Sequence, residues 1–119
     1  KDDDATVLAR FCENGKPAVT MKNADGFTSI LYSAKYANAE VIRAVAKLAG
    51  CHIYEEAGNV LYANKNYITH HASRSGKVKI KLPTKKDVWE VYENKCYGEN
   101  TDVIEYNAIY GETKMFKLI

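Results

Sequence analysis

The sequence predicts an α+β fold that is mostly antiparallel β-sheet and contains a single helix. Its 119 residues include nine Tyr but only two Pro, and aromatic and β-branched residues favour strands. Short apolar segments recur about every ten residues between turn residues, a spacing typical of small sandwiches. Only residues 39–49 change to a helical period. Hydrophobic and charged fractions of 46% and 27% are ordinary for a globular domain.

A three-strand meander is predicted at the start of the chain. Residues 6–12 place apolar side chains on one face, and Asn14-Gly15 follows them. Asn-Gly between two apolar runs is a strong hairpin signal, because both residues tolerate positive φ. The return strand covers residues 18–22, and residues 27–33 form the third strand.

The stretch 39–49 is predicted to be the helix. Its apolar residues recur at helical spacing, at Val41, Ile42, Val45 and Leu48. Asn38 precedes it as the N-cap, and Gly50 suits the left-handed residue that ends a helix. We expect the helix to cover one face of the meander, because an apolar helical stripe packs against another element.

Residues 57–119 are predicted to form a small six-stranded β-sandwich or Greek-key module. The strands cover residues 60–63, 67–72, 77–82, 87–93, 103–109 and 113–118. Pro83 should end the third of these strands, because proline has no N–H for the ladder. Residues 94–100 are expected to be a polar loop, and His52 to Glu55 a further short strand that precedes the module.

The chain thus divides into an αβ segment at residues 1–56 and an all-β accessory module at residues 57–119. No linker rich in Pro, Gly or Ser separates them, so we expect the two parts to pack as one unit. The chain begins with Lys1 rather than Met. We interpret it as a segment excised from a longer protein.

Composition argues against several function classes. The net charge of +2 is too small to indicate nucleic-acid binding, and no apolar run approaches the ~18 residues of a membrane span. Cys12, Cys51 and Cys96 are odd in number and far apart, so we interpret them as free thiols acting as small hydrophobes, with one disulfide left open. No cofactor is indicated. Free thiols fit a reducing compartment or, where they are buried, a periplasmic or secreted parent protein.

Three groups of polar residues could carry chemistry. The neighbours His70-His71 should point to opposite faces of a strand, so they cannot share a metal ion. Glu55-Glu56, or Glu90 with Glu93, could supply the carboxylate pair of a glycosidase, but we favour solvated surface for all of them. Cys51-His52 are adjacent in a strand, which is the wrong geometry for an activated thiol.

Two side-chain patterns could form binding surfaces. Lys77, Lys79 and Lys81 share one strand face and could bind an anion, although we favour a solvated face that discourages edge pairing. The larger aromatic side chains could stack on a sugar or anchor the core, and we favour the core because each ring buries a large area. These rings are Tyr67, Trp89, Tyr92 and Tyr106. The candidate carbohydrate contacts among them are Tyr67, Trp89 and Tyr92.

A series of segments resembles one protein family in order along nearly the whole chain. Residues 7–11 and 14–19 resemble the last hairpin of the glutamine-amidotransferase-like domain of β-galactosidases that have a trimerisation domain. A strand and a helix follow in that family, and residues 27–33 and 38–50 take those places. The small C-terminal β domain of the family is similar to residues 58–64, 67–73, 77–83, 87–92, 111–113 and 116–118.

The resemblance implies a non-catalytic accessory domain of a larger glycoside-hydrolase-like protein. The catalytic barrel of the family, which holds its two acidic residues, is absent, so no catalytic residue carries over to this chain. The implied partner is the catalytic domain of the parent chain, through which the accessory domain could join a homo-oligomer. Two alternatives stay open: a carbohydrate-binding module that uses exposed aromatic residues, and a small stand-alone enzyme. The enzyme would need a polar pocket that holds His52, His70 or His71 beside a carboxylate or thiol.

Overall fold

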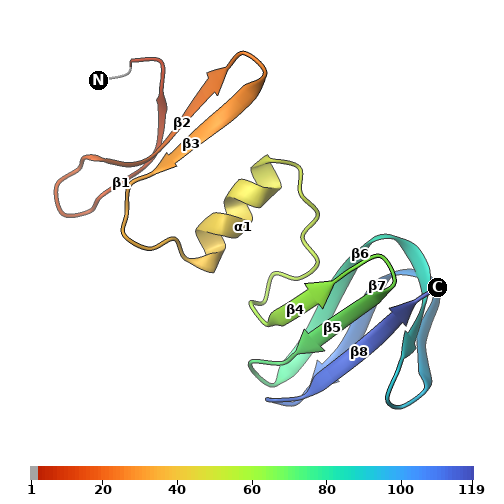
Figure 1. Cartoon of the computed structure of the whole chain (residues 1–119). Coiled ribbons are helices and arrows are strands. Elements are labelled where there is room, and N and C mark those ends of the chain that lie inside the picture. The colour runs from red at the N-terminus through yellow and green to blue at the C-terminus, as the bar shows by residue number, and fades with distance from the viewer. Residues whose placement is uncertain (1–2) are drawn as a thin grey trace. The chain divides into compact units, whose positions relative to one another are not determined.

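The computed structural model describes residues 3–119 and confirms an α+β chain that is mostly antiparallel β-sheet (Figure 1). It contains a three-stranded sheet of order β1-β2-β3 and a five-stranded sheet of order β4-β5-β8-β6-β7. The chain divides into two compact units, with the boundary between Ile42 and Arg43 inside the helix.

The predicted meander forms the first unit. Its strands are β1 (Thr6–Arg10), β2 (Pro17–Ala24) and β3 (Phe27–Tyr32), and each pairs antiparallel with the next. The first turn is the one that Asn14-Gly15 predicts. The Asn14 Oδ1 accepts the Lys16 N–H at 2.9 Å, and Gly15 has a φ of 68°.

Both faces of this small sheet carry apolar side chains. Met21 lies opposite Ile30 on one face. Neighbouring residues of a strand point to opposite faces, so Leu31 lies on the other face, opposite Thr20. Phe27 and Leu31 on that second face are 64% and 63% exposed. Sheets with two apolar faces are normally covered on both sides.

Helix α1 (Ala39–Leu48) confirms the helix prediction, including both of its ends. The Asn38 Oδ1 accepts the Val41 N–H at 2.9 Å, as an N-cap should. Gly50 has a φ of 73°, and the Cys51 N–H then donates to the Ala46 carbonyl at 2.9 Å. No residue of α1 is buried, and its cover of the meander stays a prediction.

The second unit has five strands rather than the six expected. They are β4 (Val60–Ala63), β5 (Tyr67–His71), β6 (Gly76–Glu90), β7 (Lys95–Ala108) and β8 (Thr113–Leu118). Two predicted strands are joined in β6, which continues through Pro83. The register between β6 and β7 breaks between Lys81 and Lys86, so Pro83 lies in an irregular stretch where the ladder does not need its missing N–H.

Two local predictions for this unit were wrong. The expected loop at residues 94–100 is almost wholly the start of β7, which pairs with the end of β6. The expected strand at His52–Glu55 is irregular. Its backbone nevertheless joins the sheet at one point, because the Tyr54 carbonyl accepts the Lys81 N–H at 2.7 Å.

The core of the second unit lies between the two halves of a curved sheet. β6 pairs with β7 along most of its length, and its end pairs with β8 on the other edge. The strands β4, β5 and β8 form a front layer over β6 and β7 (Figure 1). Phe116 is fully buried and contacts the rings of Tyr97 and Tyr106 edge-on or tilted. The other buried apolar residues are Ile68, Ala72, Val78, Ile80, Leu82, Val88, Ile104, Ala108 and Leu118.

Candidate functional site

Two of the three candidate carbohydrate contacts lie on one face of the five-stranded sheet. Tyr67 on β5 and Trp89 on β6 both lie directly opposite Lys117 on β8. Residues opposite each other in antiparallel strands share a face, so the three side chains form a row. Tyr67 and Trp89 are 38% and 39% exposed. Tyr92 follows the end of β6 in a turn and lies outside this row.

A second row extends the same face. Tyr62 on β4 lies opposite Thr69 on β5, which lies opposite Met115 on β8. Thr69 and Met115 are each two residues from the first row, so they point to the same side. We call this surface the outer aromatic face, made of Tyr62, Tyr67, Thr69, Trp89, Met115 and Lys117.

The preference for a core role was wrong for most of the large aromatic residues. Of the four named rings, Tyr67, Trp89 and Tyr92 are exposed, and Tyr106 alone packs against the buried cluster. Phe116 takes the central place in the core. Trp89 follows Val88, which is fully buried, so the pleat of β6 turns the indole outward.

The two adjacent histidines point to opposite faces, as predicted. His70 is fully buried, whereas His71 is exposed with its Nδ1 2.8 Å from the Thr113 hydroxyl. The His70 Nδ1 lies 2.6 Å from the Tyr106 hydroxyl, and its Nε2 lies 3.4 Å from the Glu55 Oε1. Burial, followed by the charge of Glu112, raises the pKa of Tyr106 above its ordinary value, so the phenol stays neutral.

Glu55 holds the segment before β4 against the inner face of the sheet. Its side chain is 4% exposed, and its carboxylate accepts the backbone N–H of Asn59 at 3.2 Å and the side-chain N–H at 2.5 Å. The prediction of a solvated Glu55 was therefore wrong. Glu56 is exposed, as predicted, and pairs with Lys47 at 3.0 Å.

Lys114 is a buried cation beside His70 on the inner face. Its Nζ lies 2.6 Å from the Glu93 carboxylate and 3.3 Å from that of Glu112. The same atom lies 5.7 Å from the ring centroids of Tyr97 and Tyr106. Burial alone would lower the pKa of Lys114, but the contacts with Glu93, Tyr97 and Glu112 outweigh it and raise the pKa.

Glu90 also points inward, which corrects its expected place on the solvated surface. It is 1% exposed, and its two carboxylate oxygens accept the N–H groups of Glu93 at 2.6 Å and Met115 at 3.2 Å. In the part of the chain that the structure describes, every buried side-chain nitrogen or oxygen has a hydrogen-bond partner. The buried polar groups therefore stabilise the fold through hydrogen bonds between its segments.

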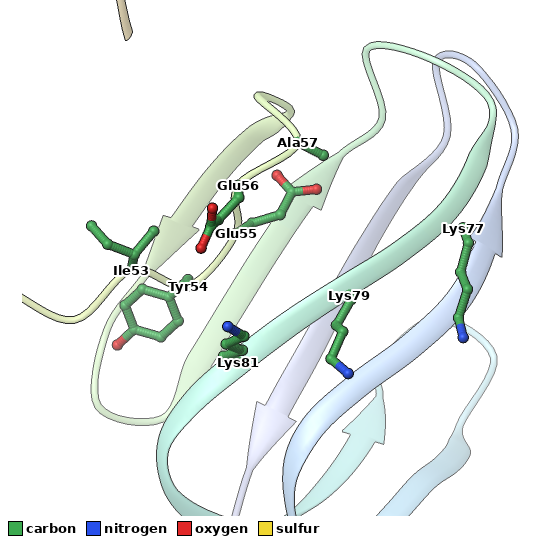
Figure 2. Close-up of a pocket in the computed structure, with 8 residues that line it drawn as sticks. All are labelled: Ile53, Tyr54, Glu55, Glu56, Ala57, Lys77, Lys79 and Lys81. Atoms are coloured by element: carbon green, nitrogen blue, oxygen red, sulfur yellow. The ribbon is translucent and has the colours of Figure 1, made fainter. Parts of the chain in front are cut away.

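The alternating lysines lie on the exposed face of β6, as predicted, while Val78, Ile80 and Leu82 are buried. A groove of about 280 Å³ lies between this face and residues 53–57 (Figure 2). The lysine charges are partly neutralised, because Lys77 and Lys79 both pair with Glu105, at 3.0 and 3.1 Å. Glu55 and Glu56 also line the groove, so its lining carries both signs of charge.

Replacement of Glu105 by Gln should lower the thermal midpoint at neutral pH, but not in acid. Hydrogen bonds from Lys77 and then Lys79 lower the pKa of Glu105 below its ordinary 4.5. A lowered folded-state pKa stabilises the fold above pH 4.5, and the contribution disappears as pH falls through the folded-state value. Melting curves on both sides of pH 4.5 measure this, with Glu99→Gln on the same strand as control. The same difference in thermal midpoint between Glu105→Gln and wild type at every pH would contradict this prediction.

The remaining groups give no clear site. Cys12, Cys51 and Cys96 are free, but Cys12 and Cys51 are exposed rather than packed as small hydrophobes. Among residues 3–119, no three His, Cys, Asp or Glu side chains are grouped so that they could hold a metal ion. No helix within that range is long and apolar enough to cross a bilayer.

No protein-family model, curated protein or solved structure matches this sequence.

Proposed function

We propose that this chain is a non-catalytic accessory part of a larger glycoside-hydrolase-like protein. One observation carries the proposal: the three-stranded sheet has apolar side chains on both faces and little of its own to cover them. Ile30 and Met21 lie on one face, and the exposed Phe27 and Leu31 lie on the other. Such a sheet is typical of the inside of a larger α/β layer.

The helix supplies cover for one face at most. An amphipathic helix has a single apolar stripe, and that of α1 includes the exposed Ile42 and Leu48. The other apolar face of the sheet still needs a neighbour. A three-stranded sheet is at the lower limit of independent stability and depends on such packing. The end of a larger α/β domain has this character, which agrees with the resemblance to the amidotransferase-like domain.

The second unit supports the same role in a different way. Its core is closed, and its buried His70, Glu90 and Lys114 are held by hydrogen bonds within the unit. Such a unit can fold as a stable small β domain appended to an enzyme. We propose that it stabilises the parent protein, as the C-terminal β domain does in the family that the sequence resembles.

The direct test is to sequence the native transcript upstream of the codon for Lys1. The proposal expects the reading frame to continue into a barrel domain with two glycosidase carboxylates. A start codon close to Lys1, or an upstream domain unrelated to carbohydrate chemistry, would overturn it.

Hydrogen exchange should separate the two units in the isolated chain. Backbone amides of β2 and β3 should exchange much faster than those of β5 and β8, because at least one apolar face of the three-stranded sheet has no neighbour to pack against. In the parent protein the amides of β2 and β3 should become protected. The amide of Ile104, which is fully buried in the second unit, serves as the internal reference. Equal protection of both sheets in the isolated chain would count against the missing neighbour.

A further inference from the structure

We propose that the outer aromatic face binds a neutral β-linked oligosaccharide across Tyr67 and Trp89. This goes beyond the accessory role, because it gives the second unit a ligand of its own. Sugars offer C–H groups on the faces of their rings and hydroxyls at their edges. A surface suited to them therefore combines flat aromatic side chains with hydrogen-bonding groups.

The register of the sheet supplies this combination. Tyr67 and Trp89 lie on either side of Lys117, one strand away from it in each direction. Neighbouring strands are about 4.8 Å apart, so the two aromatic positions are separated by about 10 Å. This is close to the repeat of two units in an extended β-1,4-linked chain. One sugar can stack on each ring, and Lys117 can donate hydrogen bonds to hydroxyls between them.

The Tyr67 and Trp89 rings of the outer aromatic face are open to solvent. Tyr67 is 38% exposed and Trp89 is 39% exposed, so a ligand can reach them. Tyr106 differs, because it packs against the core and its hydroxyl lies 2.6 Å from the His70 Nδ1.

The charge of the face favours a neutral ligand over a nucleic acid or an acidic glycan. Lys117 is the one charged side chain among its six residues, and exposed Asp87, two residues before Trp89 on the same side of β6, has the opposite charge. Nucleic-acid surfaces need several basic groups. The clustered lysines lie elsewhere, on the outer side of the first half of β6, where Glu105 pairs with two of them. Thr69 in the second row adds a hydroxyl that can donate or accept.

Trp89 is the only tryptophan of the chain, so its fluorescence reports directly on the proposed site. The 119-residue chain is titrated with cellohexaose, xylohexaose and β-1,4-galactotetraose, with glucose as the short comparison. We expect a saturable shift of the emission with at least one oligosaccharide, and at least about tenfold weaker binding of glucose. No shift and no heat of binding with any of these sugars would overturn the proposal.

Three variants locate the ligand. Tyr67→Ala should weaken binding by about tenfold, the size of one lost stacking contact, and Trp89→Ala, followed by calorimetry, should do the same or more. Tyr110→Ala removes an aromatic side chain that is 74% exposed in the β7–β8 turn and should leave binding unchanged. Circular dichroism and an unchanged melting curve identify the folded variants. Binding that survives both substitutions on the face would place the sugar elsewhere and overturn the inference.

A protein ligand would give a different result. If Trp89 emission depended on protein concentration without sugar, and Tyr67→Ala removed that dependence, the face would bind a second copy of the chain and the sugar proposal would be wrong. The transcript test of the accessory role is independent of these titrations. If the reading frame continues upstream but no sugar binds, the accessory role stands and the proposed sugar site is wrong.

Discussion

Replacement of Phe116 by Ala should lower the free energy of unfolding of the second unit by about 4 kcal/mol. The side chain is fully buried at the meeting point of β8 with the layer of β6 and β7. Its ring centroid lies 5.2 Å from that of Tyr97 and 5.8 Å from that of Tyr106. The truncation therefore removes the transfer free energy of a phenyl ring and leaves a cavity that these rings can fill only in part.

Urea unfolding followed by Trp89 fluorescence measures this effect in the second unit alone, because Trp89 is the only tryptophan and lies on β6. Phe27→Ala is the matched control, since Phe27 is 64% exposed on the three-stranded sheet. The control should leave the Trp89 transition within about 0.5 kcal/mol of wild type. A Phe116→Ala loss below about 1 kcal/mol would mean that the core is organised around another residue.

The elements of the fold could be predicted where local signals agree. Asn14-Gly15, the helical spacing after Asn38 and the strict alternation at residues 77–82 each determine an element through nearest neighbours in the sequence. The prediction failed at Pro83. Proline does lack the N–H that a regular ladder needs, but the sequence does not show that the ladder is irregular at this point. The β6–β7 register breaks beside Pro83, and an irregular ladder tolerates a missing N–H. Such a break depends on a partner strand about twenty residues away along the chain.

The buried polar residues could have been predicted in part from the same alternation. Lys114 is two residues from Phe116, Glu90 is two residues from Val88, and all four point inward. The period of the strand indicated burial, whereas the charge of the side chains suggested surface. The alternation prevailed because each charge has partners from distant segments, as with Lys114 and Glu93 at 2.6 Å. Sequence alone does not show those partners.

The outer aromatic face depends wholly on register. Tyr67 and Trp89 share a face because each lies opposite Lys117, on a strand that follows both of them in the sequence. No periodicity within one strand indicates that pairing, because each strand determines only which side a residue faces. The sequence could therefore name the two rings as candidates but could not place them on one surface.

Replacement of Lys114 by Ala should lower the free energy of unfolding of the second unit by about 3 kcal/mol. The side chain is 8% exposed, while the carboxylates of Glu93 and Glu112 are 50% and 29% exposed. Water can solvate those carboxylates after the substitution, so the loss stays below that of a fully buried pair. Lys114→Met keeps an unbranched aliphatic side chain in the buried position and should lose about 1 kcal/mol. Lys117→Ala, on the exposed side of the same strand, is the control.

The dependence of stability on alkaline pH separates the charge of Lys114 from its packing. The raised pKa of Lys114 stabilises the fold in full below the ordinary value of 10.5, and the contribution is lost as pH rises through the folded-state value. Tyr106 acts in the same direction, because burial keeps its phenol neutral while an unfolded chain would ionise it above pH 10. Urea midpoints should therefore fall more steeply above pH 10 in the wild type than in Lys114→Met or Tyr106→Phe. Identical slopes in all three proteins would mean that neither group titrates with folding, and that Lys114 acts through the packing of its stem alone.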